Sequence, residues 1–226
     1  MNAVSFLSAL QLADSALPSG RFAHSAGLEA LVGESGPPSE NDLSEFVASH
    51  VCDAVAPLDG VVVAHAARAR SLEALLSLDV CVGARKLTPG ARLASTRCGR
   101  QLARTTDVLT DDALANELAD AVRQRATGGH LAVVEGTLAR AVGLNAEEAV
   151  LVALRGAASS ALSAALRLGA ISAHSAQRLL YQLHPSIVRA CERALETSLA
   201  DLHSSAPELE VLALAHPRGD ARSFTT

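Results

Sequence analysis

The sequence predicts an all-α protein that forms a single compact domain of about ten helices. Hydrophobic residues make up 49% of the 226 residues, mostly as alanine, leucine and valine, and aromatic residues make up only 2%. Alanine and leucine are strong helix formers, and the apolar residues recur at the three- and four-residue spacing of helices. No linker composition divides the chain, so we expect residues 1–226 to share one core.

The helix boundaries follow from residues that cap or break helices. The first predicted helix is short and apolar and stops at residues 18–20, because proline donates no backbone hydrogen bond and glycine accepts a positive φ. Thr88 followed by Pro89 is a strong start signal, a hydroxyl cap ahead of a proline in the first turn. Further helix starts are predicted near Ser25, Ser39, Pro57, Ser71, Asp111, His130, Asn145, Ser172 and Pro185.

Charge and composition disfavour several classes of partner. The formal net charge is −5, with no tryptophan and one tyrosine, whereas nucleic-acid-binding proteins normally present a basic and often aromatic surface. The most apolar window, residues 149–168, contains arginines and serines, so we predict a buried helix and not a membrane span. The N-terminus lacks the basic region of a signal peptide, and four scattered cysteines fit thiols in a reducing cytoplasm. We expect a cytoplasmic protein that binds neither nucleic acid nor membranes.

Signatures of enzymes and of metal sites are missing from the sequence. There is no phosphate-binding G-x-x-x-x-G-K-[ST] loop, no H-E-x-x-H and no G-x-S-x-G. The eight histidines contain no i, i+3 or i, i+4 pair, so no preformed metal cage is visible. We expect a protein that is not an enzyme and has no catalytic, cofactor-binding or metal-binding residues.

The segment from Leu10 to Glu29, LQLADSALPSGRFAHSAGLE, carries the most specific pattern in the chain. Its simplest interpretation is a helix–turn–helix corner. The order of a D-S-x-L-P-x-G turn and F-x-H-S-x-G-L-E, however, resembles the N-terminal signature of the urease accessory protein F family (UreF). The matching residues are Asp14, Leu17, Pro18, Gly20, Phe22, His24, Ser25, Gly27, Leu28 and Glu29.

A basic stretch lies between residues 79 and 107, an interval without acidic side chains. Arg97, Arg100 and Arg104 are three and four residues apart, so they share one strip of a helix. Two interpretations stay open, an ordinary solvated face and a docking strip for an acidic partner.

The segment ARLASTRCGRQL around this strip is similar to a second UreF segment and adds Arg92 to the expected partner-binding residues. This chain lacks the family's acidic residue ahead of Arg92 and has Cys98 where methionine is usual. Any ion pair made by that acid is therefore not expected here.

Three further segments extend the resemblance toward the C-terminus. GHLAVVEG (129–136) and ALRLGAISAHSAQRLL (165–180) match the family in part, but its Pro-Leu-Gly-Gln is replaced at residues 169–172. The tail, residues 215–226, is polar and is expected to be mobile. Its ending matches the family at His216, Arg222 and Phe224, and arginine and aromatic residues often anchor interfaces. We expect the tail to fold onto a partner, and the alternative is an ordinary frayed terminus.

The resemblance implies an all-helical, dimeric assembly factor. Members of the family bridge a second urease accessory protein (UreD/UreH type) to the accessory GTPase (UreG type), and the complex delivers nickel to the urease apoprotein. Small-residue helix faces at residues 91–98 and 157–165 also favour a homodimer. Weak nickel binding through His24 or at a dimer axis is left open. The alternative class is a helical ligand-binding or regulatory domain with an alanine-lined pocket.

Overall fold

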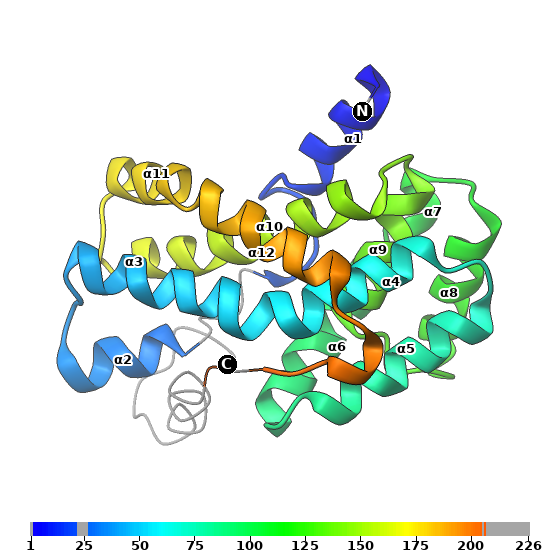
Figure 1. Ribbon diagram of the computed structural model, residues 1–226, viewed down its shortest axis with the longest axis horizontal. Helices are drawn as coiled ribbons and strands as arrows, with labels where there is room; N and C mark the ends of the chain where they lie inside the picture. The colour runs from blue at the N-terminus through cyan, green and yellow to red at the C-terminus, as the bar shows by residue number, and fades with distance from the viewer. Residues whose placement is uncertain (1, 22–26, 205, 207–226) are drawn as a thin grey trace.

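The computed structural model of the chain describes residues 2–21, 27–204 and 206. Throughout these residues the protein is built from helices and loops without a strand, so the predicted all-α class is confirmed. The longest α-helix, α10 (Ala146–Arg167), packs against helices from both halves of the chain. The N-terminal helix projects from the body of the molecule (Figure 1).

The helices follow in chain order. The first half contains α1 (Ala3–Leu12), α2 (Leu28–Ser35), α3 (Glu40–Ser49), the π-helix η2 (His50–Gly60), α4 (Val61–Arg68), α5 (Leu72–Arg85) and α6 (Pro89–Ala103). The second half contains α7 (Thr106–Leu109), α8 (Ala113–Arg123), α9 (Leu131–Ala141), α10, α11 (Ala173–Gln182), α12 (His184–Glu196) and the short 3-10 helix η3 (Leu199–Asp201).

Local capping chemistry places most helix starts where the sequence predicts them. Ser39 and Asn145 each form a capping box with the acidic residue three positions later. The hydroxyls of Ser71, Thr88 and Ser172 accept backbone N–H groups of the first turns of α5, α6 and α11. These side chains satisfy donors that have no partner within their own helix.

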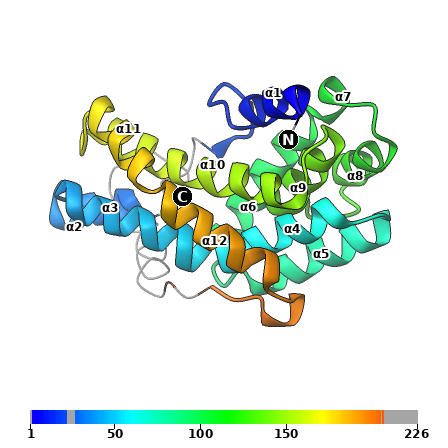
Figure 2. The same cartoon turned by 45° about the horizontal axis from the view of Figure 1, so that its top comes forward.

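The predicted helix start at Pro57 is wrong. Pro57 lies inside η2, because α3, η2 and α4 run end to end from residue 40 to residue 68 as one rod (Figures 1 and 2). Proline removes a donor and crowds the preceding turn of an α-helix, and here it falls in a π-helical stretch with wider turns. The helix predicted to begin near Asp111 is α8, which is capped by Asp112. The predicted start near Ser25 lies outside the described residues.

Close contact between α4 and α9 forms one side of the core. Val61, Val62 and Val63 of α4 have no exposed surface. A Cβ on Gly136 of α9 would lie 2.4 Å from the carbonyl oxygen of Val63, so only glycine allows the two backbones to approach this closely. The glycine in the interior of α9 is therefore explained by packing.

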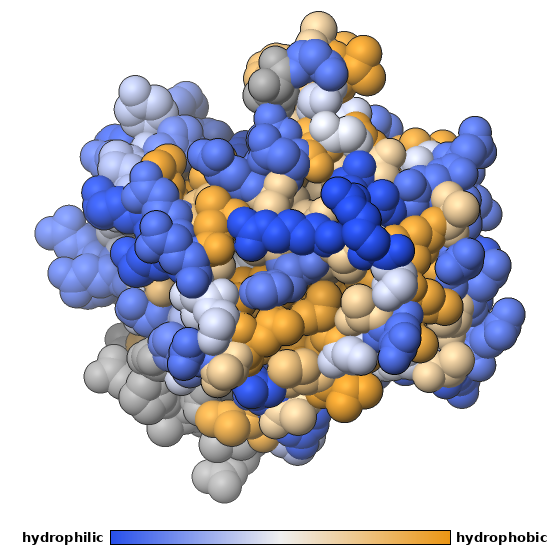
Figure 3. Space-filling view, turned by 45° about the vertical axis from the view of Figure 1, so that its right-hand side comes forward, coloured by the Kyte–Doolittle hydropathy of each residue, from blue (hydrophilic) through white to orange (hydrophobic). Residues whose placement is uncertain are grey.

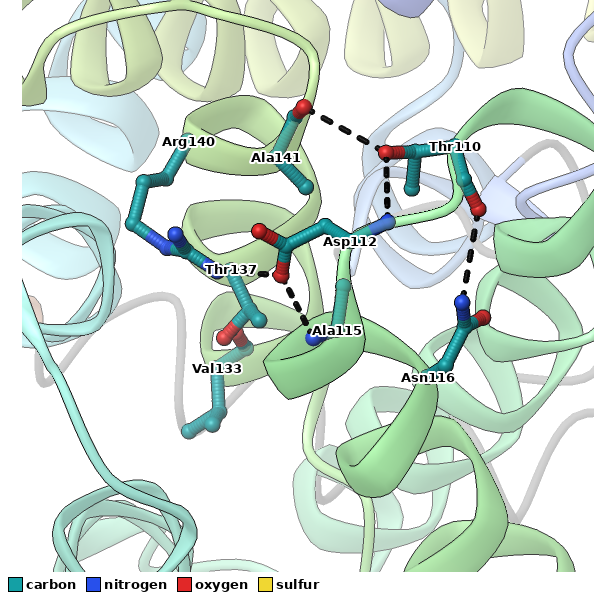
Figure 4. A network of polar contacts seen from close by, with 8 residues as sticks. All are labelled: Thr110, Asp112, Ala115, Asn116, Val133, Thr137, Arg140 and Ala141. Carbon is teal, nitrogen blue, oxygen red and sulfur yellow. Dashed lines mark hydrogen bonds and ion pairs between the residues drawn. The ribbon is translucent and has the colours of Figure 1, made fainter.

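A polar network joins the start of α8 to the end of α9 (Figure 4). The Asp112 carboxylate accepts hydrogen bonds from the Ala115 N–H and from the Arg140 guanidinium. Thr110 donates its hydroxyl to the carbonyl of Ala141 at 3.3 Å and accepts the N–H of Asp112 at 3.2 Å. Partial burial of Asp112 by itself would raise its pKa, but these hydrogen bonds and the Arg140 charge outweigh it and lower the pKa overall.

Two helical stretches are long and apolar enough to cross a membrane by length and composition, Glu40–Arg68 and Ala146–Arg167. Half of each apolar window is buried inside the protein. The buried faces pack against other helices of the protein.

The small-residue helix faces that favoured a homodimer are used largely inside one protomer. Ser95 and Cys98 of α6 are buried, and so are Ala158, Ala161 and Ala165 of α10. The close packing permitted by small side chains therefore joins α6 to α9 and places α10 in the core. Ala91 of α6 stays exposed and Ala157 of α10 is only partly buried, so a dimer contact through the outer part of these faces stays a prediction.

Candidate interaction site

The signature segment forms a tight turn between α1 and α6. The Asp14 carboxylate accepts the N–H of Ala16 at 2.8 Å, the chain reverses, and the N–H of Ser19 donates to the carbonyl of Leu17 at 2.7 Å. Gly20 has φ of +75°, a conformation that favours glycine. A Cβ on Gly20 would lie 3.8 Å from both Cys98 and Gln101 of α6. The turn thus lies directly against the arginine-bearing helix.

Arg21 fastens the end of this turn to the core. Its guanidinium forms an ion pair with Glu135 of α9 and donates to the carbonyl of Ala153 of α10 at 3.3 Å. Its own carbonyl accepts the hydroxyl of Ser160 at 3.1 Å. A Cβ on Gly156 would lie 2.2 Å from the Arg21 guanidinium, so Gly156 provides the space that the side chain occupies. Burial raises the pKa of Glu135, and the charge of Arg21 opposes that shift.

A second buried junction holds α5, α6 and α9 together. The carboxylate of Asp79, only 3% exposed, accepts hydrogen bonds from the N–H groups of Gly129 and His130 and from the Thr127 hydroxyl. The Nδ1 atom of His130 lies 3.1 Å from the Ser95 hydroxyl of α6. Burial lowers the pKa of His130, so the neutral imidazole is favoured in this junction.

The basic stretch divides into inward and outward side chains. Lys86 forms an ion pair with Asp59 at 2.8 Å, and Arg85 donates to the carbonyls of Cys81 and Leu199. Neither side chain is therefore available to an outside partner in the way that the basic interval suggested.

The four arginines predicted to bind a partner are all exposed, three of them on α6 and Arg104 at its C-cap. Arg92 donates to the carbonyls of Lys86 and Leu87 at the connection between α5 and α6. Arg100 uses Nε to bind the carbonyl of Gly128 at 3.1 Å, and Arg104 donates to Gln101. Arg97 forms no hydrogen bond or ion pair with any described residue.

The other predicted residues divide between the described part of the chain and the rest. In the described part, Leu17 is half-buried, Pro18 is exposed, Gly27 adopts φ of +89°, and Leu28 is fully buried as the first residue of α2. Glu29 follows it as the first-turn carboxylate of α2. Outside the described residues lie Phe22, His24, Ser25, His216, Arg222 and Phe224.

Arg21, Glu135 and Asp79 hold this site together, and the sequence pattern did not predict their roles. The only available signal was a charged residue in or beside an otherwise apolar, family-like segment, as with Glu135 in GHLAVVEG. Among residues 2–21, 27–204 and 206, no group of three or more histidine, cysteine, aspartate or glutamate side chains could hold a metal ion.

The fold and this site define a class of protein, an all-helical protein in which a firmly held turn lies beside an exposed basic helix. Comparisons with known proteins agree with that class and narrow it. The sequence profile of the UreF family matches residues 38–184. This chain belongs to the UreF family.

Curated relatives extend the match to nearly the whole chain. Urease accessory protein UreF 2 of Brucella canis is 33% identical over 218 residues, which cover 95% of this chain and 89% of the relative. UreF 1 of Brucella melitensis is 31% identical over 95% of this chain and 90% of its own length. UreF of Yersinia pestis (strain Pestoides F) is 29% identical over the full length of both chains. Membership of this family implies a role in urease maturation.

Proposed function

We propose that this protein is a scaffold in urease maturation, without catalytic activity of its own. In this role it bridges a second accessory protein of the UreD/UreH type and the accessory GTPase of the UreG type. Nickel is the cargo of the complex, and the urease apoprotein receives it. The observation that carries the proposal is the near full-length similarity to proteins named urease accessory protein UreF.

The geometry supports a role based on surfaces. The signature turn lies against α6 at Gly20, and Arg21 holds it to α9 and α10, so it offers a fixed shape to a partner. Pre-organised surfaces lose less conformational entropy when they bind. Figure 3 shows one face, on which apolar patches lie among hydrophilic side chains, as protein-binding surfaces commonly do.

A homodimer is part of the proposal, and α1 is its best-supported contact. Phe6, Leu7 and Leu10 are each about half exposed or more, and Ser5 is the buried residue of the helix. A projecting helix with exposed apolar residues gains stability when a partner covers it. A second copy of the chain would supply an equivalent surface, as twofold symmetry requires.

The alternative, a ligand-binding domain, has less support. A pocket of about 350 Å³ lies between α1 and the end of α9, and its lining includes the apolar Val4 and Leu12 and the polar Ser8 and Gln11. No titratable side chain lines it, whereas perturbed titratable groups often mark ligand and active sites.

Reconstitution of urease activation tests the proposed function. Urease apoprotein and its accessory proteins would be expressed with this chain, without it, or with a variant that lacks residues 216–226. We expect activation and co-purification of the accessory proteins with the full chain only. A full chain that neither co-purifies with them nor supports activation contradicts the proposal, and an active truncated chain contradicts only the role of the tail.

A further inference from the structure

One face of α6 combines three arginines with an exposed leucine. Leu93, Arg97, Arg100 and the C-cap residue Arg104, which keeps a right-handed helical backbone, follow at intervals of four, three and four residues, so they line a single side of the helix. Leu93 is 44% exposed, and the three arginines are exposed as well. We call these four residues the α6 strip.

The backbone beneath the α6 strip is firmly held. The inner face of α6 buries Ser95, whose hydroxyl accepts the N–H of Leu131, and Gly99, which lies against the backbone of Gly129. Arg100 is further oriented by the bond from its Nε to Gly128, which leaves its terminal nitrogens for other acceptors. The strip is therefore a pre-organised surface, because its helix and one of its guanidinium groups are already fixed.

The positive charge of the strip is not neutralised within the described part of the protein. Residues 80–106 contain no acidic side chain. On the neighbouring α8, Asp120 pairs with Arg123, which also lies 4.0 Å from Asp107. No ion pair involves Arg97, Arg100 or Arg104 among the described residues. Arginines near the C-terminus of a helix also offset its dipole, but this effect does not account for Arg97 or for the exposed leucine.

The chemistry of the strip indicates its occupant. A guanidinium presents a planar fork that matches a carboxylate, and an exposed leucine beside it offers an apolar contact to the same segment. Nucleic acid fits less well, because the chain carries a net charge of −5 and α6 has no aromatic side chain for base stacking. One leucine is also a small apolar surface for insertion into a lipid bilayer.

We infer that the α6 strip is a docking surface for an acidic polypeptide segment with carboxylates one helical turn apart and an apolar residue at one end. The inference rests on the proposed function in one respect, since the partner would be one of the urease accessory proteins. The strip contributes the salt-sensitive part of that contact, because charge pairs at an exposed surface steer association and are screened by ions.

The test compares two charge-reversal variants with the same change in net charge. R97E/R104E reverses the strip and keeps Arg100, which holds Gly128. R189E/R193E reverses two exposed arginines of α12 and serves as the matched control. Binding to the purified accessory proteins is measured at low and at physiological salt. We expect R97E/R104E to bind at least about tenfold more weakly at low salt, with a shallower salt dependence, and R189E/R193E to bind like the unaltered chain.

A synthetic probe separates this inference from the proposed function. The probe is a glutamate-rich helical peptide with one leucine ahead of its first glutamate, and its lysine-rich counterpart is the control. We expect the unaltered chain to bind only the acidic peptide and R97E/R104E to lose that binding. If the reversal variant fails to fold, the neutral R97Q/R104Q takes its place.

Several outcomes would overturn the inference. One is equal affinity of R97E/R104E and the unaltered chain for the accessory proteins, and another is no preference for the acidic peptide. Tighter binding to a random-sequence DNA duplex or to phosphatidylserine vesicles than to the acidic peptide would also reject it. If the unaltered chain binds the acidic peptide but does not support urease activation, the proposed function is rejected and the inference about the α6 strip is kept.

Discussion

Gly99 of α6 lies so close to Gly129 that a Cβ on Gly99 would sit 2.0 Å from the carbonyl oxygen of Gly129. This contact brings α6 against the start of α9. It explains why the matched segment ARLASTRCGRQL has glycine at a helix-interior position, where glycine costs stability.

We predict that G99A destabilises the protein by roughly 3 kcal/mol, because the added methyl group meets backbone that cannot move aside as a side chain would. The measurement is the free energy of unfolding in urea. The control is G33A in α2, where an added Cβ would meet no atom within 4 Å. This control should gain about 0.5–1 kcal/mol. Equal effects of the two variants would show that the Gly99 contact is not tight.

Replacement of Asp79 by alanine should lower the free energy of unfolding by about 3 kcal/mol. The change leaves the buried N–H groups of Gly129 and His130 without their acceptor, and each unsatisfied buried donor is costly. D120A removes an exposed carboxylate that pairs with Arg123 at the surface. That control should change stability by less than about 1 kcal/mol. A small effect of D79A would mean that the start of α9 finds other acceptors.

The Asp112 network predicts a pH dependence. Because the folded-state pKa of Asp112 is lowered, its contribution is fully present above the unfolded pKa, near 4, and is lost as the pH falls through the folded value. The difference in unfolding free energy between the unaltered chain and D112N should therefore be largest near neutral pH and shrink in acid.

The neighbouring exposed carboxylate provides the control for this pH dependence. D111N changes the adjacent side chain, which lies outside the network of Figure 4. Unfolding curves recorded across the acidic range should show no comparable pH-dependent difference for D111N. If the unfolding free energies of D112N and the unaltered chain differ by the same amount at every pH, the ionised form of Asp112 is not the stabilising species.

Replacement of exposed apolar side chains of α1 by acidic ones should convert the proposed homodimer into a soluble monomer. F6E/L10E should dissociate the proposed homodimer and leave the melting temperature of the protomer nearly unchanged, because both side chains are about half exposed. Sedimentation at micromolar concentration is the measurement. V108E alters a residue of α7 that is 81% exposed and should leave the dimer intact. A dimer that survives F6E/L10E would exclude α1 as the contact.

Elements governed by neighbouring residues could be predicted from the sequence. The capping boxes at Ser39 and Asn145 and the hydroxyl cap at Thr88 depend on side chains within three residues of the helix start, so their positions were predicted correctly. The basic strip on α6 was visible for the same reason, since its spacing is that of a single helix.

Elements governed by distant residues could not be predicted. Asp79 binds backbone that lies 50 and 51 residues further along the chain, and Arg21 pairs with Glu135 across 114 residues. Neither pairing leaves a periodic signal in the sequence. Pro57 misled the prediction because a proline usually marks a helix boundary, whereas the π-helix continues through it.

The rod of residues 40–68 has a consequence for insertions and deletions. Each residue of a regular helix turns the chain by about 100°, and a π-helical stretch sets a different angular offset between the two ends of the rod. The offset fixes which side of α3 and which side of α4 meet the core. Removal of even the exposed Asp53 should rotate α4 relative to α3 and turn Val63 away from Gly136 of α9. The number of residues in this stretch therefore matters more than any single contact, because it sets the rotation of α4 relative to α3.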